Sequence, residues 1–114
     1  MNKKKKIKTK KPWGYEILIE TNKFYSVKKL FMKKGHRCSL QYHKKKIETI
    51  IVLDGELNIF INKKRKKFKP GSIITINNKI VHKMQAIREN CRYLECSSNH
   101  LKDVIRLNDK YGRC

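Results

Sequence analysis

Residues 39–56, SLQYHKKKIETIIVLDGE, place polar side chains in a segment that otherwise has the composition of β-strands. Gln41 and His43 are two residues apart, so in an extended chain both side chains leave the same face. In a strand that starts at residue 48, Glu48 shares its face with the apolar Ile50, which marks that face as the core side. A carboxylate turned toward a core is costly unless a charge or hydrogen-bond partner meets it, and a metal ion is one such partner.

A second histidine belongs to the same pattern. His82 begins a later predicted strand and shares its face with Met84, so it also points inward. Taken singly, a His or Gln near a strand end is more often an ordinary polar residue than a ligand. Together these residues favour one divalent ion, Zn first and Mn, Fe, Co or Ni as alternatives, because mixed N and O ligands discriminate weakly. The expected ligands are Gln41, His43, Glu48 and His82.

The rest of the chain has the sequence pattern of an all-β protein. No helical period persists for ten residues. Asp54-Gly55 is a strong turn signal and predicts an antiparallel hairpin between its flanking strands, and Pro70-Gly71 predicts another turn. Many short strands with frequent turns indicate an antiparallel sandwich or barrel. The predicted strands are residues 15–20, 24–32, 48–54, 56–62, 72–77, 82–87 and 92–97.

Length and the N-terminal sequence define the domain organisation. A chain of 114 residues is one domain with a single core. Residues 1–11, MNKKKKIKTKK, are expected to be a basic arm, and residues 12–114 the folded domain. No apolar stretch follows the lysines, so we expect neither a signal peptide nor a membrane anchor. Trp13 is expected to pack at the end of the barrel.

Net charge and cysteine spacing bear on partners and location. The formal charge is +21, yet 24 of the 30 basic residues are Lys, whereas Arg is the residue that phosphate and base readout favour. We therefore favour compositional bias and expect no specific nucleic acid and no membrane partner; a polyanion-binding surface and attraction of an anionic substrate are the alternatives. The four cysteines form no CxxC pair, which indicates a reduced, cytoplasmic protein.

The spacing of these residues resembles the cupin family. Five residues separate Gly35 from Gln41, one separates Gln41 from His43, four lead to Glu48 and six to Gly55. This is similar to the first cupin motif, with Gln in place of its first His. The stretch from Gly71 to His82 is similar to the second motif, although Asn77 and Lys79 replace the usual Pro and Gly. The resemblance implies a small antiparallel, jelly-roll-like cupin barrel, and its sheet edges favour a homodimer.

A narrower resemblance covers about 100 residues from position 11 onward. KPWGYEILIE, SLQYHKKKIETIIVLDGE and DVIRLNDKYGR look like the mannose-6-phosphate isomerase domain that ends bifunctional isomerase/mannose-1-phosphate guanylyltransferase enzymes. The resemblance implies a stand-alone domain that interconverts mannose 6-phosphate and fructose 6-phosphate and feeds GDP-mannose synthesis. Its substrate would be a phosphorylated hexose. The alternatives are a metal cupin acting on another phosphosugar and a non-catalytic sugar- or polyanion-binding cupin.

One departure from that family concerns Lys44–Lys46, where relatives tend to be His-rich. Either Lys45 supplies a cation in place of the missing His, or the chain keeps the fold without the activity. Aldose–ketose isomerisation also needs a base and a phosphate-binding cation. Glu95 is the expected base, and Arg106 the expected phosphate ligand because a guanidinium can bind two oxygens at once. Lys28 is the second cation; alternatively its stem covers the core with the amine in water.

Overall fold

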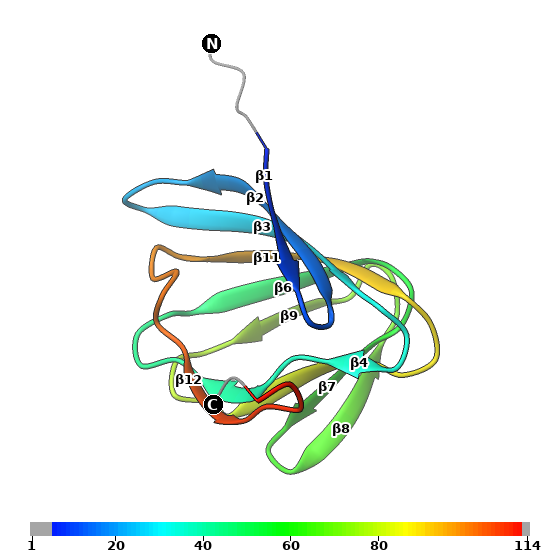
Figure 1. Cartoon of the computed structure of the whole chain (residues 1–114). Coiled ribbons are helices and arrows are strands. Elements are labelled where there is room, and N and C mark those ends of the chain that lie inside the picture. The colour runs from blue at the N-terminus through cyan, green and yellow to red at the C-terminus, as the bar shows by residue number, and fades with distance from the viewer. Residues whose placement is uncertain (1–5, 113–114) are drawn as a thin grey trace.

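The computed structural model describes residues 6–112, which form an all-β domain (Figure 1). These residues contain twelve strands and no α-helix, so the predicted all-β class is confirmed. No helix in this part of the chain is long and apolar enough to cross a membrane. The strands form two antiparallel sheets that face each other across the core.

Each sheet mixes strands that are distant in the sequence. The first sheet has the order β1 (Ile7–Lys11), β2 (Gly14–Thr21), β3 (Tyr25–Met32), β11 (Cys91–Ser98), β6 (Glu48–Asp54) and β9 (Ile73–Ile76). The second sheet has the order β12 (Ile105–Asn108), β5 (Leu40–Tyr42), β10 (His82–Ala86), β7 (Leu57–Ile61) and β8 (Lys64–Phe68). The short strand β4 (His36–Arg37) also pairs with β10.

The core lies between the sheets and follows the period of two expected for strands. Ile50 of β6 and Ile59 of β7 are fully buried and belong to one core cluster, although they come from opposite sheets. Trp13 is only 5% exposed and belongs to the same cluster, as its predicted packing role requires. The inward faces are therefore fixed by burial, and any polar residue of the same parity is carried into the interior.

The turn at Asp54-Gly55 exists, but the hairpin predicted there is wrong. Strand β6 already pairs with β11 on one edge and β9 on the other, so β7 has no free edge to join. Gly55 instead takes the chain from the first sheet to the second. Its φ of 73° is in the left-handed region, and a Cβ there would collide with the carbonyl oxygen of Asn90.

The structure also contains strands that composition did not reveal. The five-residue strand β8 is Lys64–Phe68, and it forms a true hairpin with β7. The turn residues Asn62 and Lys63 have φ of 51° and 61°, as a type I′ turn requires. In the N-terminal segment expected to be an arm, Ile7–Lys11 instead form β1, because β2 offers an unpaired edge. Residues 1–5 lie outside the described part.

Candidate metal centre and adjoining cavity

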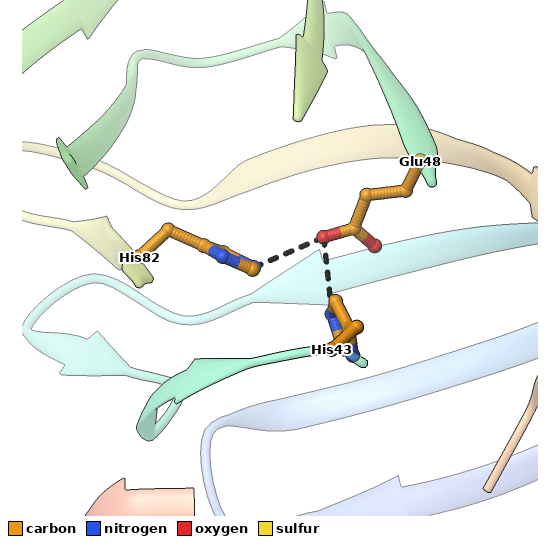
Figure 2. A group of neighbouring side chains, drawn as sticks. All are labelled: His43, Glu48 and His82. Carbon is orange, nitrogen blue, oxygen red and sulfur yellow. Dashed lines mark ion pairs between the residues drawn. The ribbon is translucent and has the colours of Figure 1, made fainter. Parts of the chain in front are cut away.

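Three buried side chains from different elements converge inside the barrel (Figure 2). Glu48 is the first residue of β6, His82 is the first residue of β10, and His43 directly follows β5. The Glu48 Oε1 atom lies 3.0 Å from His82 Nε2 and 3.4 Å from His43 Nε2. One potential ligand atom of each residue lies within 4.8 Å of the others, so the structure brings together three of the four predicted ligands.

Hydrogen bonds on the far side of each ring decide which nitrogen faces Glu48. His43 Nδ1 is 2.5 Å from the Asp103 carbonyl oxygen, and His82 Nδ1 is 2.8 Å from that of Ile80. A carbonyl oxygen can only accept, so both Nδ1 atoms must carry the proton. In the neutral rings each Nε2 then presents a lone pair toward the carboxylate, the orientation that protein carbonyls commonly impose on metal-binding histidines.

The atoms that meet at this point are all acceptors. Four buried atoms here lack a hydrogen-bond partner among the described residues: His43 Nε2, His82 Nε2 and both carboxylate oxygens of Glu48. Buried polar atoms without partners are rare, and a divalent cation would satisfy three of them at once. Burial is the largest single influence on the pKa of His43 and lowers it, but the contacts with Glu48 and with the Asp103 carbonyl together raise it more, so the net pKa lies above the ordinary value. A proton can therefore occupy the place of a cation, and the two would compete.

Gln41 is placed beside this group. It lies on β5 opposite His82, and its side chain lines the same cavity as His43. Its Oε1 atom accepts a hydrogen bond of 2.7 Å from the buried Ser39 hydroxyl, which fixes the orientation of the amide. Its role as a fourth ligand remains a prediction.

Lys46 is a buried residue that the sequence analysis missed. Its Nζ atom lies 3.1 Å from Glu95 Oε2 and 3.6 Å from Glu48 Oε2, so one ammonium bridges two carboxylates. Lys45, the cation expected to enter the site, is exposed. The period of two could have found Lys46, because it stands two residues before the inward Glu48.

Asp103 holds the loop that presents Lys46. Its carboxylate accepts backbone N–H groups of Lys44, Lys45 and Lys46 at 3.1, 2.7 and 2.9 Å. These bonds lower the pKa of Asp103 to about 2. Because the backbone carbonyl of the same residue binds His43, Asp103 positions both a candidate ligand and the bridging lysine.

Glu95, the expected base, lines the interior cavity from β11. Burial, followed by the negative charge of Glu48, raises its pKa to about 7, while the charge of Lys46 opposes the shift. A carboxylate with a pKa near neutrality can accept and return a proton at physiological pH. The role of Glu95 as the base is still a prediction.

The two predicted phosphate ligands also reach the cavity, which measures about 110 Å³. Lys28 Nζ lies 3.4 Å from Glu16 Oε1, so its amine is turned inward and paired and is not in open water. Arg106 lies opposite Gln41 in the β5–β12 pair, and its Nε atom is buried without a hydrogen-bond partner in the described part of the chain. The cavity is lined by Lys11, Trp13, Glu16, Lys28, Leu30, Cys38, Gln41, His43, Lys46, Met84, Tyr93, Glu95, Leu101, Val104 and Arg106.

Comparison with known proteins identifies the family. The model of the family "Mannose-6-phosphate isomerase C-terminal" matches residues 1–109. The chain belongs to this family. Mannose-1-phosphate guanylyltransferase of Escherichia coli is 28% identical over an alignment of 111 residues, and the match covers 91% of this chain and 23% of that protein. The chain therefore spans about a quarter of the length of this relative of the mannose-6-phosphate isomerase C-terminal family.

Solved structures show that this family member has the cupin fold that the motif spacing predicted. A cupin-like protein from Thermotoga maritima superposes with a TM-score of 0.74 at 20% identity, covering 83% of this chain and 76% of that one. Oxalate decarboxylase from Bacillus subtilis gives a TM-score of 0.79 at 16% identity, covering 90% of this chain and 30% of that one. At these identities the likeness extends to the fold alone.

Proposed function

We propose that this domain is a metal-dependent isomerase that interconverts mannose 6-phosphate and fructose 6-phosphate. The observation that carries the proposal is the position of Glu95, a carboxylate with a pKa of about 7 that lines the cavity and is joined through Lys46 to the candidate ligand Glu48. Membership in the mannose-6-phosphate isomerase C-terminal family supports the choice of reaction. The cations that line the same cavity support a phosphorylated substrate.

The residues divide the reaction between them. Glu95 takes the proton from C2 of the aldose, which leaves an enediolate, and returns a proton to C1 to give the ketose. A divalent ion held by His43, Glu48 and His82, Zn first, would supply Lewis-acid stabilisation of the negative charge that develops on the sugar oxygens. Lys46 holds the Glu95 carboxylate in place through its 3.1 Å contact.

Binding of the phosphate falls to two other cations that line the cavity. Arg106 is the first choice, because its guanidinium forms paired hydrogen bonds with phosphate oxygens and its Nε atom has no partner in residues 6–112. Lys28 is the second, although Glu16 already neutralises part of its charge. Phosphate contacts are made in the ground state and the transition state alike, so they govern KM more than kcat.

A coupled assay with mannose 6-phosphate, with and without chelator, tests the proposal. We expect Glu95→Gln to lower kcat by roughly 10²- to 10⁴-fold with the metal retained, and to stop deuterium exchange at C2. Arg106→Ala should mainly raise KM, and Gln41→Ala mainly lower kcat. Glu89→Gln, at an exposed acid, serves as the control. Normal turnover and exchange in Glu95→Gln would place the base elsewhere.

One contact favours a second candidate, a non-catalytic cupin that binds phosphosugars. The Glu95 carboxylate is held by Lys46, so it is less free to take up a proton than an unpaired base. In that case calorimetry would show mannose 6-phosphate binding, whereas solvent deuterium would never enter any hexose 6-phosphate. Exchange at C2 in the wild-type protein excludes this candidate.

A further inference from the structure

A second cavity, of about 380 Å³, adjoins the outer face of the second sheet; it contains none of the candidate metal ligands and shares only Cys38 with the lining of the interior cavity. Strand alternation places it there. Lys83 alternates with the buried His82 and Met84 of β10, and Phe60 alternates with the buried Ile59 of β7. The Lys83 Nζ atom lies 5.3 Å from the centre of the Phe60 ring, so both side chains share this outer face. The lining residues are Arg37, Cys38, Leu40, Phe60, Lys83, Asn108 and Lys110.

The charge of this cavity is uncompensated. No carboxylate lines it, and within residues 6–112 none forms an ion pair with Arg37, Lys83 or Lys110. Arg37 and Arg65 both repel the charge of Lys83. A bound anion would relieve this repulsion, and its contacts would be charge-assisted hydrogen bonds.

The basic composition of the chain does not by itself account for the group of cations at this cavity, Arg37, Lys83 and Lys110. Lysine is abundant over the whole chain, so a group of lysines by itself would distinguish no surface. Arginine is scarce, with six residues in 114, yet Arg37 lines this cavity and the charge of Arg65 acts on Lys83. Arginine is also the side chain whose planar fork fits the oxygens of a phosphate.

The remaining lining residues suit a ligand that is more than an inorganic ion. Phe60 and Leu40 provide apolar surface, and Asn108 provides an amide that can donate and accept. The volume lies in the range of about 300–1,000 Å³ typical of small-molecule sites. We propose that this outer cavity binds a phosphorylated small molecule with a flat or apolar portion, as a site separate from the interior one.

Titration with adenosine monophosphate, which carries a phosphate and a flat ring, tests the site on the full chain. At constant ionic strength we expect the backbone amide NMR signals of Arg37, Phe60 and Lys83 to shift in a saturable way. Lys83→Gln and Arg37→Gln should each weaken binding about tenfold, the loss expected for one charge-assisted contact. The binding should persist in excess chelator and in His43→Ala, which separates it from the interior site.

Lys23→Gln is the matched control. Lys23 Nζ lies 5.2 Å from the centre of the Phe24 ring, so it repeats the lysine–phenylalanine geometry outside the cavity. This variant should bind within about twofold of the wild type. Equal losses in Lys23→Gln and Lys83→Gln, or shifts spread over the lysines of both sheets, would show nonspecific attraction to a cationic protein and overturn the proposal. A circular dichroism melt of each variant confirms that it is folded.

Discussion

Lys46 lies between Glu48 and Glu95, and the charge balance of the interior depends on this one ammonium group. Lys46→Met leaves both carboxylates buried without their cation. We expect the metal-free variant to lose about 3–5 kcal/mol of unfolding free energy, the usual effect of breaking a buried ion pair. Added zinc should restore more stability to the variant than to the wild type, because the ion replaces part of the missing charge.

Urea unfolding with chelator and with zinc measures both effects. Lys45→Met is the matched control, since the neighbouring lysine is exposed, and it should change the unfolding free energy by less than about 0.5 kcal/mol. Equal destabilisation by the two substitutions would mean that the buried contacts of Lys46 contribute no more to the unfolding free energy than the exposed charge of Lys45.

Cys91 predicts a specific pH dependence of stability. Burial, with smaller contributions from Asp54 and Glu89, raises the pKa of this thiol to about 12. In the unfolded chain the thiol ionises near pH 8.5–9, so above that range the unfolded state binds fewer protons than the native state. The unfolding free energy of the wild type, measured relative to that of Cys91→Ala, should therefore decrease as the pH rises. The decrease should be up to roughly 1.4 kcal/mol per pH unit between pH 9 and 12.

Parallel urea titrations of wild type and Cys91→Ala at pH 8, 9 and 10 give this difference directly. Cys96→Ala, on the opposite face of β11, supplies the comparison for a partly exposed cysteine. A difference that stays constant across these pH values would contradict the assignment.

At the scale of elements, the β7–β8 hairpin depends on its turn. Lys63 has a φ of 61°, a conformation that is unfavourable for a residue with a Cβ atom and costs glycine nothing. Lys63→Gly should therefore stabilise the protein by about 1 kcal/mol. Lys64→Gly, one residue later and within β8, should destabilise it by about 0.5–1 kcal/mol. Thermal unfolding of both variants tests this prediction. A lower unfolding temperature in both variants would show that the turn is not strained.

The same hairpin shows how far the sequence predicts elements. Alternating or continuous apolar runs identified β6, β7, β9 and β10. The run KRKKF has no such signal, because β8 faces solvent along most of its length, and its pairing comes from the Asn62 turn. Pairing across Asp54-Gly55 was predicted wrongly because partner choice for β6 depends on β11, about 40 residues away, which no local pattern reports.

The candidate site was more predictable than the topology. Spacing by two placed Gln41 and His43 on one common face and Glu48 on the core face without knowledge of the strand partners. Lys46 obeys the same rule, but a run of three lysines resembles a solvated surface. Its burial depends on the Asp103 carboxylate, which reaches the loop from 57 residues further along the chain. Such long-range contacts cannot be read from a single sequence.

At the scale of the whole molecule, charge is divided between surface and interior. Of nine acidic residues, Glu16, Glu48 and Glu95 lie in or beside the interior cavity, whereas the net charge of +21 is carried by a largely basic surface. A cationic surface raises the local concentration of anions, phosphosugars included, in a salt-dependent way. The buried carboxylates would favour a cation at the interior site even though the surrounding surface is positive.

The candidate ligands come from both sheets, since Glu48 belongs to the first and His82 to the second. A bound ion would therefore join two layers that must separate when the chain unfolds, and it can be captured only after they have docked. This arrangement bears on the lifetime of the native state. Interactions that are absent from the folding transition state slow unfolding and leave the folding rate nearly unchanged. In stopped-flow experiments, zinc should lengthen the unfolding time of the wild type, and His82→Ala should show no such delay.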